Sequence, residues 1–570
     1  MTGYFRQNDG MFKQLKVRAL KYILPIIPLL FVAACAEPIP EEPERPEPPA
    51  EYLELLKAKE ADAVFSGVEA SSTSSKVCFL DRAVAVPVSS FRIHDCTVSA
   101  PAEVTPAGEW WSVGGIVYAI KVERNLSRAE SVPIYAYYDK ITLYIYLSNS
   151  EILVFDSVAK KEQEELERRQ HIPIVRITTS GGAEIKDKEN YVRGTITIED
   201  PEKLCSDVEN FSASMGIRGR GNSTWGWRKK PWKVKLDSKA SLLGMPADKE
   251  WCLLANYSDK TLLRNIVAMK LSEICGFSWT PKMESVEVYL NGKYQGVYNL
   301  CEHKKISKER VNIDIVGEND NEGEAVTGGY YLEMEESQDE TTCWWTAMNV
   351  PMMFNTPEVP TPAQYNYMTG YIDDFEKALC SNDFADPQKG YAAYIDVASF
   401  INYYIVQELT KNVDGNLRKS SFITKERGKK MEMYHLWDFD LTLGNCGYFP
   451  WKVGNGPENF WIKNYSSKSI YGDGWFFRMF KDPAFVDALQ KRWNALLPEL
   501  KQVTAFIEEQ ALILDKAQRR NFDLWGINTV DPEMAWIKYT PKGSYSAEIK
   551  FLKEFYTSRL EWLDKEINKL

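Results

Sequence analysis

Apolar and polar residues alternate along several short segments in the middle of the chain, a pattern typical of half-buried β-strands. In Trp232-Lys233-Val234-Lys235-Leu236, apolar side chains are expected on one face and two lysines on the other. Segments 285–290 and 294–300 are joined by Asn291-Gly292, a strong signal for a two-residue hairpin turn. Further strands are predicted at 172–178, 192–198, 213–218, 251–254 and 330–334. This part of the chain is therefore expected to be rich in sheet.

The periodicity becomes helical further along the chain. A first helix is predicted over 260–275, with Asp259 as its N-cap candidate. A long helix over 394–411 leads into the turn Asn412-Val413-Asp414-Gly415-Asn416. A second hairpin, from strands 421–424 and 431–437, ends in Trp437-Asp438-Phe439-Asp440. Other helices are predicted at 363–379, 474–480, 483–501, 503–521 and 544–568. Residues 172–570 are therefore predicted to form one α+β domain.

Residues 51–156 have a different pattern, with short β-like runs separated by turns. The spacing predicts a small β-sandwich domain. The predicted strands are 76–80, 83–87, 115–122, 131–137, 142–147 and 151–155. Aromatic residues such as Trp110, Trp111 and Tyr118 fit either a sugar-binding face or the domain's core. We favour the core.

The first 35 residues have the pattern of an export signal. Lys13, Lys16, Arg18 and Lys21 precede an apolar run that is too short to span a membrane comfortably. The run ends in Val32-Ala33-Ala34-Cys35, which resembles a bacterial lipobox. We therefore predict a lipoprotein signal peptide over 1–35, with Cys35 as the lipidated residue. A plain cleaved signal peptide is the alternative.

Two connecting segments follow from composition. Residues 36–50 are rich in proline and glutamate, which predicts an extended tether. Residues 157–171 contain a charged run without glycine, which predicts a linker with a short solvated helix. The protein is thus expected to be anchored to a membrane by lipid on Cys35. Its location would be the bacterial cell envelope, at the outer membrane or the cell surface.

Composition narrows the classes of function. The net charge is -11 and the isoelectric point about 5.3, which argues against a nucleic-acid partner. The ten cysteines include no C-x-x-C pair, and only four histidines accompany them. An exported protein can hold disulfides, and Cys78 with Cys96 is the pair we expect. Most of the other cysteines are expected to be buried free thiols.

Residues 217–236 stand out against this acidic background. They contain seven cationic residues, three glycines and no acidic residue. Glycines allow close approach of the backbone to a ligand, and backbone N–H groups in such turns bind anions. A phosphate ligand therefore suits this segment. Composition alone fits a basic surface loop even better.

The order of the remaining motifs favours a phosphate site over a surface loop. A sheet-rich segment with a basic strand is followed by a helix, then Asp414, a hairpin, and Asp438. Protein kinases have this order, with one aspartate that accepts the proton of the substrate hydroxyl and a second that holds Mg²⁺. The metal neutralises phosphoryl charge while the first aspartate positions the nucleophile.

Several spaced motifs together give the chain from 172 to beyond 450 a resemblance to the CotH kinase family, the spore-coat protein H-like atypical kinases. The motifs are Arg218-Gly219-Arg220-Gly221-Asn222-Ser223-Thr224-Trp225, 230–236, 243–246, 251–257, 259–265, 289–298 and Trp437-Asp438-Phe439-Asp440. The resemblance implies a divergent, two-lobe protein-kinase-like fold that binds ATP and Mg²⁺, with Mn²⁺ as another candidate metal. It does not extend to residues 51–156.

Site residues follow from the resemblance by position. Asp414 is the candidate catalytic residue, and Asp438, with Asp440 second, the candidate metal ligand. Lys233 and Lys235 are candidates for the nucleotide phosphates, assisted by Arg218. As the carboxylate that pairs with that lysine, Glu273 has two rivals, Glu302 and Glu333.

Some positions depart from ordinary kinases. Asn412-Val413-Asp414 replaces His-Arg-Asp, and Asp438-Phe439-Asp440 lacks the glycine of Asp-Phe-Gly. Lys419 stands where an ordinary kinase has a metal-binding asparagine, so Asn416 or Asn445 would have to substitute.

The leading hypothesis is an exported, lipid-anchored protein kinase that transfers the ATP γ-phosphate to serine or threonine hydroxyls of a protein substrate. The alternative is a catalytically silent surface protein on a kinase-like scaffold, whose N-terminal domain binds glycan or protein. A third hypothesis is nucleotidyl transfer from the same site.

Overall fold

The computed structural model describes residues 165–207, 209–336, 342–415, 417–447, 456–463 and 474–570, together with the backbone of eight strands before residue 165. The predicted signal peptide with Cys35, the tether 36–50, the Cys78–Cys96 pair and Asn416 lie outside the described residues. The chain divides into two compact units, Met1–Lys160 and Lys161–Leu570. Residues 165–169 of the predicted linker are helical.

The strands of the first unit pair in three antiparallel sheets. Its strands are β1 (Val68–Ala70), β2 (Ser75–Val77), β3 (Val84–Pro87), β4 (Gly108–Val113), β5 (Val117–Val122), β6 (Val132–Tyr138), β7 (Ile141–Leu147) and β8 (Glu151–Phe155). The largest sheet has the order β3-β8-β7-β6, whereas β1 pairs with β2 and β4 with β5. The pattern of the sequence missed β1 and β4. The β-sandwich stays a prediction.

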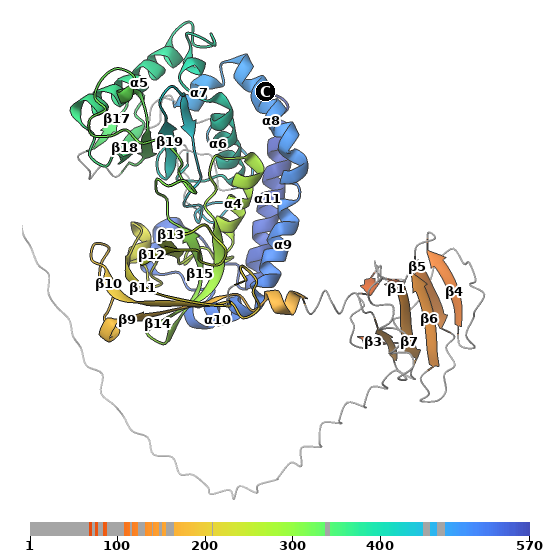
Figure 1. The fold of residues 1–570 in the computed structure, drawn as a ribbon. Helices are drawn as coiled ribbons and strands as arrows, with labels where there is room; N and C mark the ends of the chain where they lie inside the picture. The colour runs from red at the N-terminus through yellow and green to blue at the C-terminus, as the bar shows by residue number, and fades with distance from the viewer. Residues whose placement is uncertain are drawn as a thin grey trace, which may run out of the picture. The chain divides into compact units, whose positions relative to one another are not determined.

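A closed seven-stranded barrel begins the second unit (Figure 1). Its strands are β9 (Ile174–Thr179), β10 (Val192–Glu199), β11 (Asn210–Gly219), β12 (Trp232–Ala240), β13 (Asp248–Leu254), β14 (Met283–Leu290) and β15 (Lys293–Glu302). Neighbouring strands are antiparallel, except that β14 and β9 close the barrel in parallel. The predicted hairpin at Asn291-Gly292 is confirmed as β14–β15.

The barrel interior follows from the alternation of the strands. Trp232, Val234 and Leu236 of β12 are buried in the barrel core, whereas Lys235 is exposed. The predicted two-faced strand is thus confirmed. The side chains of both lysines point outward from the barrel, because successive side chains point to opposite sides of a strand.

A five-stranded sheet and a set of helices form the rest of the second unit. The sheet has the order β17-β18-β16-β19-β20. These strands are β16 (Tyr330–Met334), β17 (Cys343–Trp345), β18 (Pro351–Thr356), β19 (Ser421–Lys425) and β20 (Met431–Met433). The main helices are α4 (Arg264–Cys275), α5 (Pro362–Cys380), α6 (Val397–Thr410), α7 (Trp475–Met479), α8 (Pro483–Leu500), α9 (Val503–Ile513), α10 (Asp515–Trp525) and α11 (Tyr545–Ile567).

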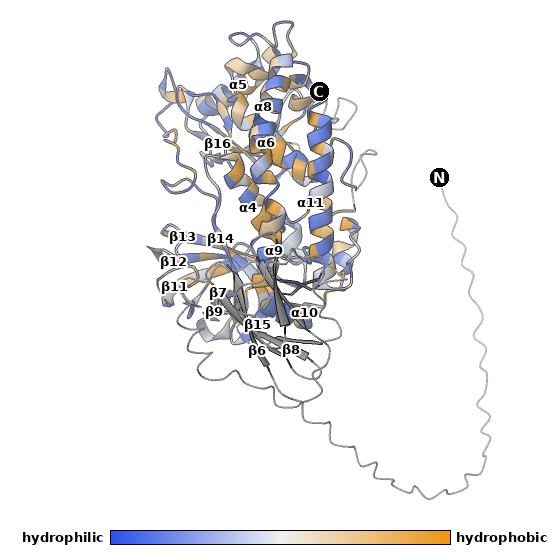
Figure 2. Ribbon diagram, turned by 90° about the vertical axis from the view of Figure 1, so that its right-hand side faces the viewer, coloured by the Kyte–Doolittle hydropathy of each residue, from blue (hydrophilic) through white to orange (hydrophobic). Residues whose placement is uncertain are grey.

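Helices α4 and α6 lie inside this part of the molecule. Most side chains of α6 are buried, and Figure 2 shows apolar residues along α4 and α6 but a polar outer face on α11. The second unit therefore has the mixed α+β composition that was predicted. Within the described residues, no helix combines the length and the apolar character needed to cross a bilayer.

Tertiary contacts shift several predicted helix boundaries. Helix α4 begins at Arg264 rather than 260, because Asp259 accepts hydrogen bonds from the backbone N–H of Thr261 (2.9 Å) and Arg264 (2.8 Å) ahead of the helix. The predicted helix 503–521 is two helices, α9 and α10, that meet at Leu514. Helix α10 turns onto the barrel, where the Asn521 amide oxygen accepts from the Val297 N–H.

Candidate active site

The glycine-rich turn lies between β11 and β12 and includes the short helix α3 (Ser223–Gly226). Gly221 has φ +82°, and a Cβ there would collide with the Thr224 hydroxyl, so this position requires glycine. After the turn, Trp227 is buried in a cluster with Val413 and Leu441. This contact holds the turn against the two aspartate-bearing loops of the helical part.

Asp414 follows the end of α6. Lys411 takes the left-handed conformation that ends the helix, with φ +48°. The Asn412 amide oxygen accepts from the Asp414 N–H (3.1 Å), and the Trp461 indole N–H donates to the Asn412 carbonyl (2.8 Å). Burial raises the pKa of Asp414 to about 6, a shift that Arg418 opposes and Asp438 reinforces. Such a carboxylate can accept a proton near neutral pH.

Asp438 and Asp440 lie on the loop after β20. Asp438 has φ +65°, a conformation that costs energy for a residue other than glycine. Phe439 between them is fully buried, and its N–H donates to the Asn265 amide oxygen on α4 (2.8 Å). Asp440 accepts from the Ser258 hydroxyl (2.7 Å). Burial raises the pKa of Asp440 to about 8, and the negative charge of Asp438 adds to the shift.

These three aspartates line one cavity of about 290 Å³ together with the glycine-rich turn. Charged side chains dominate its wall. The ten charged residues are Arg220, Lys304, Glu333, Glu335, Glu336, Asp414, Arg418, Lys419, Asp438 and Asp440. The excess of two carboxylates favours a bound cation. The four cationic side chains are available to contact an anion.

The three cations expected at the phosphates do not line this cavity. The Arg218 guanidinium donates to the Lys188 carbonyl and lies over the Tyr191 ring. The Lys233 ammonium lies 2.8 Å from a Glu250 carboxylate oxygen on the outer face of the barrel. Lys235 is exposed on the same face.

Other cations line the cavity instead. Lys304, two residues after β15, forms an ion pair with Glu333 on β16. Glu333 also accepts from the Asn355 amide (2.9 Å). The Arg220 guanidinium lies 5.7 Å from the centre of the Trp437 ring. Glu333 is one of the three carboxylates that the sequence offers for such a pair, but the sequence pattern favours a lysine on β12 as its partner.

The other two candidate glutamates lie elsewhere. Glu273 pairs with Lys270 and Lys282 on the surface, and Glu302 accepts from the Lys282 N–H (2.9 Å). Neither residue lines the cavity. Lys419, in the place of the kinase asparagine, lies 3.1 Å from Glu336.

The donor set suits a hard divalent cation. Carboxylate oxygens are the ligands that Mg²⁺ prefers, and it takes only one or two of them beside phosphates and water. Among the described residues, no group of three or more His, Cys, Asp or Glu side chains is arranged to hold a metal ion. The Asn445 amide nitrogen donates to the Asp440 carbonyl (2.7 Å), and its buried amide oxygen has no hydrogen-bond partner among the described residues.

A glycine-rich turn, an ammonium–carboxylate pair and two aspartate-bearing loops around one cavity are the parts that kinase-type phosphotransfer proteins share. A family model described as CotH kinase protein matches residues 217–563, which is more than half of the chain. The chain therefore belongs to the CotH kinase protein family, as its motifs predicted. A search of curated proteins found no matching sequence.

Proposed function

We propose that this protein is an atypical protein kinase that transfers the γ-phosphate of ATP to serine or threonine hydroxyls of a protein substrate. The observation that carries the proposal is the convergence of Asp414, Asp438 and Asp440 on the cavity that also holds the Lys304–Glu333 pair. These groups come from four separate segments of the chain. A structural role alone would not require them to share one solvent-accessible cavity.

The proposed roles follow from charge and position. Asp438 and Asp440 would hold Mg²⁺ or Mn²⁺, which supplies positive charge to the transferred phosphoryl group. Lys304 and Arg220 line the cavity, so we assign the phosphate contacts to them rather than to Arg218, Lys233 or Lys235. Glu333 holds the Lys304 ammonium in place.

Asp414 would orient the acceptor hydroxyl and take its proton. Its raised pKa keeps a useful affinity for a proton, yet leaves most of the carboxylate ionised above pH 6. Arg418, which bonds Glu336 at 2.9 Å, adds positive charge on this side of the cavity. The oxygen of the hydroxyl would then attack the γ-phosphorus, and ADP would leave.

Location and partners belong to the same proposal. The lipobox-like Cys35 and the tether 36–50 support a lipid-anchored protein of the cell envelope. Its substrate would then be a protein exported with it or exposed on the surface, and residues 51–156 would bind glycan or protein. Labelling with palmitate and its loss in Cys35→Ala would test the anchor.

The activity is tested with the purified full chain, γ-labelled ATP, Mg²⁺ or Mn²⁺, and a dephosphorylated generic protein acceptor. We expect label in the acceptor from the native protein and at least a hundredfold less from Asp414→Asn and Asp438→Asn. Asp487→Asn, an exposed surface change, is the matched control. Label from α-labelled ATP instead would mean nucleotidyl transfer, and no nucleotide binding by calorimetry would refute the proposal.

A further inference from the structure

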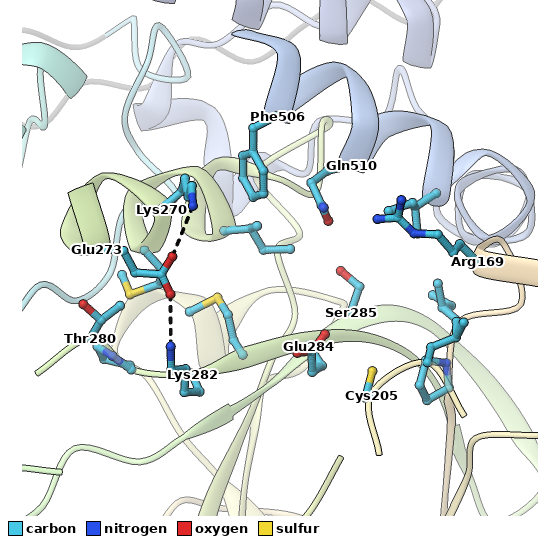
Figure 3. Close-up of a pocket in the computed structure, with 18 of the residues that line it drawn as sticks. Arg169, Cys205, Lys270, Glu273, Thr280, Lys282, Glu284, Ser285, Phe506 and Gln510 are labelled. Atoms are coloured by element: carbon cyan, nitrogen blue, oxygen red, sulfur yellow. Dashed lines mark hydrogen bonds and ion pairs between the residues drawn. The ribbon is translucent and has the colours of Figure 1, made fainter. Parts of the chain in front are cut away.

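A second, larger cavity lies away from the candidate active site. It has a volume of about 550 Å³ and lies between α4, α9 and the beginning of β14. Figure 3 shows Phe506 and Gln510 of α9 facing Glu284 and Ser285 of β14 across it. None of its lining residues lines the active-site cavity. Its volume falls in the range of ligand sites.

The cations around this cavity are already paired. Arg168 lies 2.7 Å from Glu165, and Arg169 lies 2.8 Å from Glu509. Lys270 and Lys282 flank Glu273 at 3.5 and 3.0 Å, and Figure 3 marks both contacts. An anionic ligand would have to displace one of these carboxylates. The cavity therefore does not favour an anion.

Glu284 is the exception to this pairing. Among the described residues, its carboxylate forms no ion pair within 4.0 Å, and the Cys205 thiol lines the same cavity. Val286, two residues further along β14, is buried in the barrel core. The side chain of Glu284 therefore points to the same face of β14, at the end of the barrel. Burial raises the pKa of Glu284 above its ordinary value and nearby Asp200 adds to the shift, whereas the Cys205 thiol and the charge of Lys282 oppose it.

Part of the wall is apolar. Met269, Met283, Phe506 and Ile513 contribute apolar surface to the cavity. A ligand that carried only charge would leave this surface in contact with water. A ligand with an apolar stem and a cationic end would cover it and also supply the missing ion pair.

We propose that this cavity binds an ammonium or guanidinium group carried on a hydrocarbon stem, with Glu284 as its ion partner and Phe506 against the stem. Two sources provide this chemistry: a free aliphatic diamine, or a lysine or arginine side chain of a protein. The site is independent of the proposed phosphotransfer, since it shares no residue with that cavity.

The test is calorimetric titration of the full chain with 1,5-diaminopentane and, separately, with a short peptide containing one internal lysine. We expect saturable binding that Glu284→Gln weakens about tenfold or more, because a charged hydrogen bond is lost. Glu273→Gln, which changes a rim carboxylate already held by two lysines, should change the affinity less than threefold. Tighter binding of the diamine or of the peptide identifies the source.

A gain-of-function variant keeps the test valid if Glu284→Gln folds poorly. Gln510→Glu places a second carboxylate opposite the first (Figure 3), so it should tighten binding of the diamine at least threefold. Absence of binding by both probes at millimolar concentration would overturn the proposal. Equal affinity in the native protein, Glu284→Gln and Gln510→Glu would overturn it as well.

Discussion

The guanidinium of Arg559 on α11 forms an ion pair with the Glu408 carboxylate on α6 at 2.6 Å, and both side chains are 0% exposed. Arg559 also donates to the carbonyls of Pro457 and Asn459, both at 2.8 Å. Glu408 in turn accepts from the backbone N–H groups of Trp461 and Ile462. The last helix is thereby connected to the segment that holds the Asn412 carbonyl beside Asp414.

Removal of one partner from this buried pair should be costly. Arg559→Met leaves the Glu408 carboxylate buried without its cation, which typically lowers the free energy of unfolding by about 3–5 kcal/mol. Urea unfolding measures the change. Arg519→Met, which removes an exposed pair with Asp515, should cost less than about 1 kcal/mol. Equal losses in the two variants would contradict a structural role for Arg559.

Lys304 and Lys235 give a matched pair of lysines for the phosphate contact. Lys304→Met should lower kcat/KM for ATP by roughly a hundredfold to a thousandfold, since it removes a preorganised charge from the cavity. Lys235→Met, on the exposed outer face of the barrel, should leave kcat/KM within about twofold. Steady-state kinetics at several ATP concentrations compare them. The reverse order of effects would return the phosphate contact to β12.

Much of the second unit could be predicted from local patterns. Alternation identified the faces of β12, and Asn291-Gly292 identified the β14–β15 turn, because both signals depend only on neighbouring residues. The division of 503–521 into α9 and α10 could not be found in this way. It depends on contacts of Asn521 with Val297 and Lys229, residues more than two hundred positions away.

The candidate site, too, could be predicted in part from local sequence patterns and in part not. Asp414 and Asp438 were predicted from chain order, and both line the cavity. The sequence favours a lysine on β12 because that strand follows the glycine-rich turn and has a regular alternation of apolar and polar residues. The barrel core, however, takes the apolar face of β12, so its lysines leave on the outside. Lys304 has no periodic pattern around it. Its position near the turn follows from the pairing of β12 with β13 and of β13 with β15, which are distant in sequence.

Mg²⁺ should stabilise the protein through the same carboxylates. Because six carboxylates and four cations line the cavity, a bound divalent cation relieves repulsion between Asp438, Asp440 and Asp414. At a concentration a hundredfold above its Kd, a ligand that binds only the native state adds about 2.7 kcal/mol. Thermal unfolding with and without EDTA measures this effect. Asp438→Asn should lose it, whereas Glu273→Gln should keep it.

The pH dependence of turnover should report the ionisation of Asp414. Its pKa is raised to about 6 by burial, and only the ionised carboxylate can take the proton of the acceptor hydroxyl. With Mg²⁺ at a saturating concentration, which keeps Asp440 ionised despite its raised pKa of about 8, kcat/KM for the acceptor should be constant above about pH 7. It should fall about tenfold per pH unit below about pH 6. Arg418 opposes the shift, so Arg418→Met should move the midpoint to higher pH. Glu432→Gln, which removes another carboxyl with a raised pKa outside the cavity, should leave the midpoint unchanged. If the midpoint were the same in Arg418→Met and in the native protein, the titration would belong to another group.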